Sequence, residues 1–328
     1  MHTEYRLPAE WELQSATLLA WPVKEADWGE QLPAAQREWA QLITAIAAHQ
    51  QVVLLVAPGH PSAVQRFEDQ PGVHVIEVDY NDVWCRDYGP VTMVRSGQRL
   101  GLDFYFNGWG GKYPAALDNR VNTLLARHAL FNRFEFRQYL FALEGGAIDS
   151  NGAGSLLINR HCLRARHPNL SRSEIDYELY SLLNIDRVLA IDIEPLPGDD
   201  TDGHIDTLAR FISRDRIAYQ SQASRDRDEL LRRQLEALDG DSGQAVELVA
   251  LPCPRGTPGN LPANYANFLF VNDAVLVPAY GVDSDEEARE VLAMALPDHS
   301  VKLVEAGAMI HQFGGPHCAT MHLPGALG

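Results

Sequence analysis

The 328-residue sequence has few cysteines and few basic residues, and each shortage argues against a class of protein. Its four cysteines, Cys85, Cys162, Cys253 and Cys318, show no C-x-x-C spacing, which argues against a zinc knuckle or a disulfide framework. Lys and Arg number 27 against 44 Asp and Glu, for a formal net charge of −17. Nucleic acid and anionic membranes are therefore disfavoured as partners, and a small cationic ligand is favoured.

The sequence also lacks long apolar runs, a leader peptide and linkers. No stretch approaches the roughly 18 uninterrupted apolar residues of a membrane span. The start, MHTEYRLPAEWELQ, has no basic end followed by an apolar run, so it is not a secretory signal and we expect a cytoplasmic protein. No Ser/Gly-rich or Pro-rich linker divides the chain, which predicts one domain over residues 1–328.

Apolar periodicity predicts many short strands and a few helices. A helix is expected over residues 36–49 and a buried strand over 51–56. Ser171 and Glu174 fit a capping box that starts a second helix. Other helices are predicted to begin near Leu117, Arg225 and Ser284, and other strands to span 73–78, 91–95, 155–159, 187–193, 207–212, 216–220, 267–271, 274–278 and 301–306.

Strands far outnumber helices in this pattern, which disfavours a doubly wound sheet of singly alternating strands and helices. Five helix-bearing units, each with several strands, suggest radial or barrel-like repetition, an arrangement that avoids long exposed sheet edges. The sequence therefore predicts an α/β fold in which functional loops connect repeated units.

Residues 81–90, NDVWCRDYGP, form a predicted loop at the end of a strand and bring together Asp82, Trp84, Arg86 and Asp87. By itself the segment is typical of a turn with a solvated ion pair and a half-buried tryptophan. Arg86 is expected to pair with the acidic residues near it in sequence.

Three later segments carry further reactive groups. Glu144 precedes two glycines, which permit a close backbone approach. His204 and Asp206 lie two residues apart at the start of a predicted strand, which would place both on one face of the pleat. Cys318 ends the run G-G-P-H-C, although a cysteine is more often a small buried hydrophobe than a nucleophile.

A zinc site is an alternative reading of part of this set, because imidazole, carboxylate and thiolate are all zinc ligands. Its ligands would be His204, Asp206, His317 and Cys318, but no spacing among them is diagnostic. The preferred prediction has no metal and no cofactor, and the other three cysteines are interpreted as structural.

Taken in order, D-x-W-x-R-D-x-G-P, E-G-G, D-G-H-x-D and G-G-x-H-C resemble the agmatine deiminase and bacterial peptidyl-arginine deiminase family. The segments LPAEWELQSATLLAWP, FNGWGGKY and NYANFLF extend the resemblance over nearly the whole chain. The resemblance implies a five-bladed, pseudo-symmetric α/β propeller of the pentein type, with the active site at its centre.

The resemblance also implies roles for individual residues: Cys318 as the nucleophile and His204 as general acid and base. A guanidinium remains protonated at any biological pH, and carboxylates can each accept a forked pair of its N–H bonds. The implied carboxylates around the substrate are Asp87, Asp206 and Glu144. The candidate substrate-binding residues are Asp82, Trp84, Arg86 and Trp109.

The implied reaction converts agmatine to N-carbamoylputrescine and ammonia through a covalent intermediate on Cys318. Free or peptidyl arginine is an alternative substrate, because it needs the same chemistry at the guanidinium and only a different mouth to the site. A non-catalytic binding protein of the same fold is a further alternative. The expected partners are the small cationic substrate and other copies of the chain in a homo-oligomer.

Overall fold

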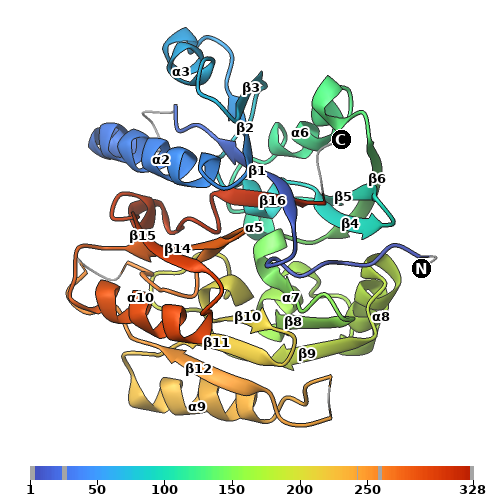
Figure 1. Cartoon of the computed structure of the whole chain (residues 1–328). Helices are drawn as coiled ribbons and strands as arrows, with labels where there is room; N and C mark the ends of the chain where they lie inside the picture. The colour runs from blue at the N-terminus through green and yellow to red at the C-terminus, as the bar shows by residue number, and fades with distance from the viewer. Residues whose placement is uncertain (1–3, 24–27, 242, 258–260, 326–328) are drawn as a thin grey trace.

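The computed structural model describes residues 4–23, 28–241, 243–257 and 261–325. These residues form five small sheets around a common centre, and most of the longer helices lie at the periphery (Figure 1). Four of the sheets have three strands and one has four. The arrangement confirms the predicted five-bladed α/β propeller. The extent of the single domain, residues 1–328, stays a prediction.

Four blades repeat one unit, in which two antiparallel strands are followed by helix and then by a third strand parallel to the second. In the first of them β4 (Val91–Arg95) pairs with β5 (Gln98–Tyr105), and α6 (Asp118–Leu125) leads to β6 (Phe134–Ala142). The next blade consists of β7 (Ile148–Ser150), β8 (Ser155–Asn159), α7 (Arg160–Arg166), α8 (Arg172–Leu183) and β9 (Arg187–Ile191). It is followed by a blade of β10 (Ala209–Ser213), β11 (Arg216–Gln220), α9 (Arg225–Glu236) and β12 (Glu247–Leu251). The last of the four consists of β13 (Leu269–Val271), β14 (Ala274–Ala279), α10 (Ser284–Ala295) and β15 (Ser300–Glu305).

The fifth blade joins the two ends of the chain. Strand β16 (Thr320–Pro324) runs antiparallel to β1 (Gln14–Ala20), so the last strand and the first close the ring. The blade is completed by α2 (Leu32–Ala47), β2 (Gln51–Val56), α3 (Pro61–Phe67) and β3 (Val73–Glu77). Cys318 therefore lies directly before the strand that closes the propeller.

The predicted elements are confirmed to within a few residues. Strands at 51–56, 91–95, 155–159 and 216–220 have the predicted bounds. The Ser171 side chain caps α8, and both hydrogen bonds of the capping box with Glu174 are present. The apolar patterns identified these elements because each buries apolar side chains in the core, but they did not identify β1, β5, β6, β7, β12 or β16.

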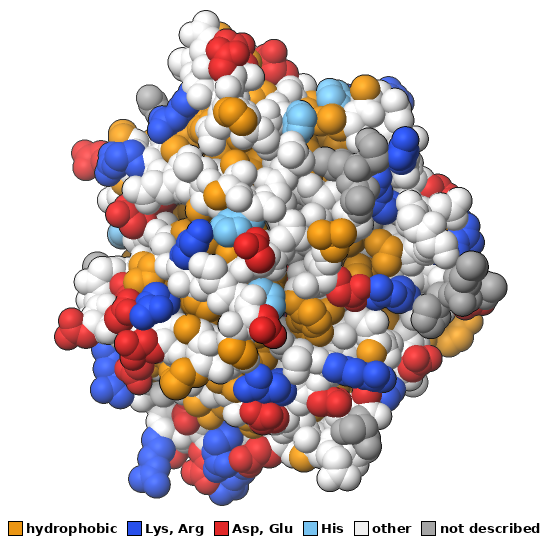
Figure 2. Space-filling model, viewed as in Figure 1, with side chains coloured by type: hydrophobic (Ala, Val, Ile, Leu, Met, Phe, Trp, Pro, Cys, Tyr) orange, Lys and Arg blue, Asp and Glu red, His pale blue; other side chains and the backbone are white. Residues whose placement is uncertain are grey.

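The surface of the described residues carries charges of both signs. On the face drawn in Figure 2, Lys and Arg side chains are interspersed with Asp and Glu rather than gathered into one basic patch. Among the described helices, none is both long enough and apolar enough to cross a bilayer. The predicted cytoplasmic location and homo-oligomer stay predictions, and the leader argument involves residues 1–3, outside the described residues.

Trp39 on α2 links the outer layer of the fold to the central loops. Its side chain is fully buried, and its ring lies 5.4 Å from that of Trp28 and 5.7 Å from that of Trp84, centroid to centroid. Aromatic rings in such edge-on or tilted contacts stabilise a core beyond the area they bury. Trp84 is thereby held by core packing on one side.

We predict that Trp39→Ala lowers the free energy of unfolding by about 3–5 kcal/mol, because it leaves a large cavity in a close-packed region. Met294→Ala is the control, since the Met294 side chain is 77% exposed and its loss should change stability by less than about 0.5 kcal/mol. Denaturant unfolding measures both variants. Equal losses of stability in the two would contradict this view of the core.

Candidate active site

Cys318 lies in a cleft in the middle of the propeller and is only 5% exposed. The side-chain amide of Asn267 donates to its sulfur over 3.1 Å. The amide oxygen of Asn267 accepts from the backbone N–H groups of His317 and Cys318, at 3.0 and 3.2 Å. One side chain therefore fixes both the thiol and the backbone that carries it.

Asp206 connects the thiol to a buried chain of ionisable groups. Its Oδ2 lies 3.6 Å from Cys318 Sγ and 2.7 Å from His317 Nδ1, and His317 Nε2 lies 2.8 Å from Glu10 Oε2. Because both ring nitrogens of His317 are engaged by carboxylates, neither is available to a metal. This arrangement argues against the zinc site of His204, Asp206, His317 and Cys318 considered as an alternative.

His204 is fully buried between two carboxylates. Its Nδ1 lies 3.7 Å from Asp87 Oδ1, and its Nε2 lies 3.8 Å from Glu144 Oε2. Neither ring nitrogen makes a hydrogen bond within the described residues. Although burial opposes the charge, the flanking carboxylates of Asp87 and Glu144 raise the pKa of His204 well above its usual value, so the ring is an imidazolium.

The prediction that His204 and Asp206 share one face of a pleat is wrong. Residues Ile205–Thr207 form a turn of 3₁₀ helix, and the strand begins only at Ala209. Gly203 adopts a φ of 84°, and the Thr201 hydroxyl accepts the His204 N–H over 3.0 Å, so the chain turns here instead of extending. The two side chains nevertheless reach the same site.

Asp87 is positioned by the segment of two glycines and by a tryptophan. Its Oδ2 accepts from Trp109 Nε1 at 2.9 Å and its Oδ1 from the Gly146 N–H at 3.1 Å. A Cβ on Gly146 would lie 2.5 Å from His204 Nδ1 and 2.9 Å from Asp87 Oδ1. Glycine at this position thus leaves the space in which the imidazole and the carboxylate meet.

Burial and charge set the protonation of the site. Burial raises the pKa of Asp87 to about 6. Burial, together with the carboxylates of Asp206 and Asp87, raises the pKa of the Cys318 thiol well above its usual value. Against the effect of burial, His204 and Arg166 lower the pKa of Glu144, and His317 lowers that of Asp206. At neutral pH the centre therefore holds ionised carboxylates and a neutral thiol.

Arg166, at the end of α7, was not singled out in the sequence. Its Nε donates to Glu144 Oε1, one Nη donates to Asp202 Oδ2, and the other donates to the Thr201 carbonyl oxygen over 2.7 Å. The Arg166 side chain thus connects the carboxylate of Glu144, which lies beside His204, to Thr201 and Asp202 in the loop at the mouth of the cleft. The run RHCLRAR resembles a solvated basic helix, and no signal in it distinguishes Arg166 from its neighbours.

The lining of the cleft includes three of the four predicted substrate-binding residues: Asp82, Trp84 and Trp109. Tyr113 and Asp200 lie at the same cleft, where the Tyr113 hydroxyl donates to the Asp200 carboxylate over 2.8 Å. The cleft therefore combines aromatic walls with carboxylates, a combination suited to a cation.

Arg86, the fourth, is absent from the described lining of this cleft and faces a second cavity. Its Nε donates to the His317 carbonyl oxygen over 3.2 Å, and its Nη2 lies 3.4 Å from Glu10 Oε2. The predicted pairing with nearby acidic residues is therefore wrong. Arg86 and Asp87 are adjacent on one helical turn, Cys85–Tyr88, and they line different cavities.

The sequence matches the family described as Porphyromonas-type peptidyl-arginine deiminase over residues 6–324. A curated relative from Vibrio parahaemolyticus, which carries agmatine deiminase as a provisional name, is 30% identical over 98% of this chain and 97% of its own.

Solved structures are also similar to this chain over nearly its whole length. A cysteine-to-serine variant of C. jejuni agmatine deiminase with substrate bound is 32% identical, covers 99% of this chain and 98% of its own, and superposes with a TM-score of 0.90. The agmatine deiminase of Enterococcus faecalis is 25% identical over 98% of this chain and 96% of its own, with a TM-score of 0.91.

We predict that chloroacetamidine, a planar cation, alkylates Cys318 faster than chloroacetamide, its neutral counterpart. A charge-assisted hydrogen bond from an amidinium to a buried carboxylate contributes about 1.5–3 kcal/mol, which corresponds to a rate ratio of about 10 to 100 beyond the intrinsic reactivities of the two reagents. Intact-mass and peptide analysis measures labelling, and a free thiol in solution calibrates the reagents. Equal corrected rates, or labelling that spares Cys318, would contradict the assigned electrostatics.

Proposed function

Because the chain belongs to the Porphyromonas-type peptidyl-arginine deiminase family, we propose that it hydrolyses agmatine to N-carbamoylputrescine and ammonia. Membership makes it a hydrolase that acts on guanidino groups. The choice of agmatine rests on one observation: carboxylates of Asp82, Asp87 and Asp200 line the cleft, and no Lys or Arg is among its described lining residues. The ammonium group of agmatine, its second positive charge, suits that lining, whereas the α-carboxylate of arginine would meet no cation there.

In this proposal the guanidinium lies between Asp87 and Asp206, in reach of the Cys318 sulfur. Asp206 Oδ1 is buried without a hydrogen-bond partner among the described residues. A buried acceptor without a hydrogen-bond partner costs free energy, so a ligand that donates an N–H group to it binds more tightly. Trp84 and Trp109 supply walls against which the planar cation packs.

The bound cation also activates the nucleophile. Its positive charge beside Cys318 opposes the effect of the two aspartates and lowers the pKa of the thiol, so the thiol loses its proton to solvent as the substrate binds. The thiolate then attacks the guanidinium carbon and a C–S bond forms. The His204 imidazolium donates a proton to one amino group, the C–N bond breaks, and ammonia leaves.

Neutral His204 then completes the cycle. It takes a proton from water as the water oxygen bonds to the carbon of the thiouronium intermediate. Collapse of the tetrahedral adduct breaks the C–S bond and returns the electron pair to the Cys318 sulfur, which takes up the hydroxyl proton of the adduct, so the neutral thiol is restored and the neutral ureido product is released. Glu144, held by Arg166, keeps the imidazole oriented and favours its protonated form before each turnover.

We predict that agmatine has the highest kcat/KM in a panel of agmatine, arginine and an N-acylarginine amide, with ammonia release as the measurement. The loss for arginine should be at least about tenfold, since its α-carboxylate is placed among like charges without a compensating cation. If an arginyl substrate is best, agmatine is the wrong choice and the deiminase chemistry still holds. If none reacts, the proposed activity itself is wrong.

The pKa of Asp87, about 6, predicts the acid limb of the pH profile. As the pH falls through this value Asp87 gains a proton and no longer accepts a charged hydrogen bond, so kcat/KM should fall. Asp87→Asn should lower kcat/KM by about 10- to 100-fold or more at neutral pH and remove this limb.

Asp69→Asn is the matched control for Asp87→Asn, because the Asp69 side chain is exposed and lies outside the described lining of the cleft. Its kcat/KM and its pH profile should equal those of the unaltered enzyme. Retention of the acid limb in Asp87→Asn would assign the titration to another group.

A further inference from the structure

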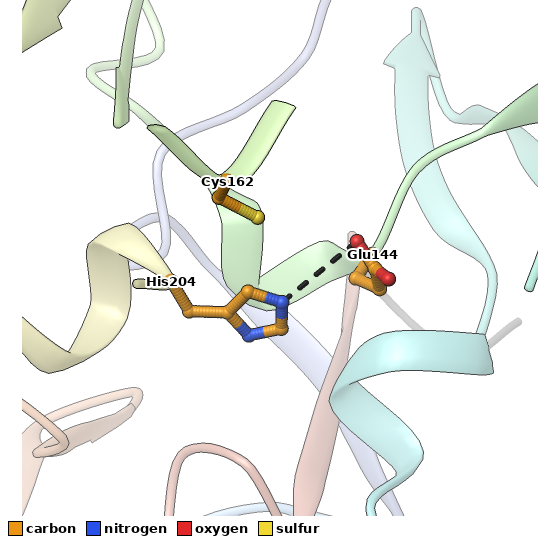
Figure 3. A group of neighbouring side chains, drawn as sticks. All are labelled: Glu144, Cys162 and His204. Carbon is orange, nitrogen blue, oxygen red and sulfur yellow. Dashed lines mark ion pairs between the residues drawn. The ribbon is translucent and has the colours of Figure 1, made fainter. Parts of the chain in front are cut away.

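Cys162, which was interpreted from the sequence as structural, lies beside the proposed acid–base pair. It belongs to α7, and its side chain points toward His204 and Glu144 (Figure 3). One ligand atom from each of the three residues lies within 4.8 Å of the other two, and all three residues are buried. Cys318 is not one of the three residues of this cluster.

The polar atoms that face one another in the cluster are unsatisfied. His204 Nε2 and Glu144 Oε2 make no hydrogen bond within the described residues, although both are buried and lie 3.8 Å apart. The Cys162 sulfur has a long contact of 3.7 Å with the Thr201 carbonyl oxygen. Buried donors and acceptors without partners are rare in native proteins, which indicates that another species can occupy this position.

The three donors match one metal in particular. Thiolate, imidazole and carboxylate are the protein ligands of zinc, with bonds of about 2.3 Å to sulfur and about 2.0–2.2 Å to nitrogen and oxygen. In a tetrahedral site, these lengths place nitrogen and oxygen ligands about 3.3 Å apart, which is close to the observed separation of His204 Nε2 and Glu144 Oε2. Small side-chain shifts would complete the geometry and leave a fourth position for water.

We propose that Glu144, Cys162 and His204 form an inhibitory site for one zinc ion. Zinc on His204 Nε2 takes the place of one imidazolium proton, and the N–H that remains on Nδ1, facing Asp87, is a much weaker acid than an imidazolium. The ring then neither protonates departing ammonia nor has a free nitrogen to take a proton from water, so the metal stops turnover. The site is not a cofactor site, because each proposed step of the reaction uses the thiol, the imidazole and the carboxylates.

Charge balance favours this exchange even though the cluster is buried. The empty cluster contains a neutral thiol, an imidazolium and a carboxylate, with a total charge of zero. Binding of Zn²⁺ displaces one proton from Cys162 and one from His204, and the total is again zero. Arg166 remains paired through Glu144 Oε1, which leaves Oε2 for the metal. The release of two protons makes binding stronger as the pH rises.

The first test is a zinc titration of the EDTA-treated full-length enzyme. Turnover should persist in EDTA, fall to near zero with added zinc, and return when EDTA is restored. Cys162→Ser should keep its basal turnover and require at least about tenfold more zinc for half inhibition, because a hydroxyl is a much weaker zinc ligand than a thiolate. Cys253→Ser, which alters a half-buried cysteine outside the cluster, should behave like the unaltered enzyme.

The second test is independent of turnover, and so it remains valid if the proposed substrate is wrong. Cobalt(II), a spectroscopic substitute for zinc, should give a thiolate-to-cobalt charge-transfer band in the Cys318→Ser protein and lose it in Cys162→Ser. The proposal is overturned if zinc inhibits Cys162→Ser as strongly as the unaltered enzyme. It is overturned equally if the band disappears in Cys318→Ser and persists in Cys162→Ser, because the metal would then sit on the nucleophile.

Discussion

Carboxylates of Asp87, Asp206 and Glu144 are buried around His204 and Cys318, and the balance of charge among these groups governs the rest of the centre. Ionised carboxylates removed from water need partners, and His204, His317 and Arg166 supply only part of that need. Burial, together with the negative charge of Asp206 and Asp87, raises the pKa of the Cys318 thiol, and acceptor atoms on Asp206 and Glu144 have no hydrogen-bond partner among the described residues. In the proposed mechanism, a planar cation that donates several N–H bonds satisfies these acceptors and lowers the pKa of the thiol, so substrate binding and activation of the nucleophile have the same physical cause.

The propeller makes this concentration of charge possible by bringing distant parts of the chain to one place. Glu10 precedes the first strand, Glu144 and His204 lie on loops between blades, and Cys318 precedes the last strand. The pairing of β1 with β16 closes the ring and places Glu10 against His317, which in turn contacts Asp206. The position of the thiol therefore depends on ring closure as well as on its local loop.

Apolar periodicity predicted repeated units of strands and helices, because many of these elements bury regular faces. The family resemblance implied the five-bladed propeller and grouped Asp87, Glu144, His204, Asp206 and Cys318 in one site. The sequence did not predict contacts that depend on tertiary approach. Arg86 and its neighbour Asp87 lie on the same short helix but line different cavities, and the acidic partner of Arg86 lies 76 residues earlier in the chain, at position 10. Spacing alone contains no information about either feature.

Other site residues were missed for different reasons. Asn267 lies in the segment NYANFLF, which contributed to the family resemblance, but an asparagine in an aromatic run gives no sign that it holds a thiol. Arg166 and Cys162 lie on one short helix, where an arginine is typical of a solvated face and a cysteine of a core. Their functional surroundings come from Glu144 and His204, which reach them from other segments.

The account depends most directly on the claim that a bound cation creates the Cys318 thiolate. The ultraviolet absorbance of the thiolate, taken as the difference between the unaltered protein and Cys318→Ser, tests this at neutral pH with and without a slowly reacting alkylamidinium. The electrostatics predict no Cys318 thiolate signal in the free protein and a signal of about one thiolate per chain when the amidinium binds. A full thiolate signal in the free protein, unchanged by the cation, would contradict the account.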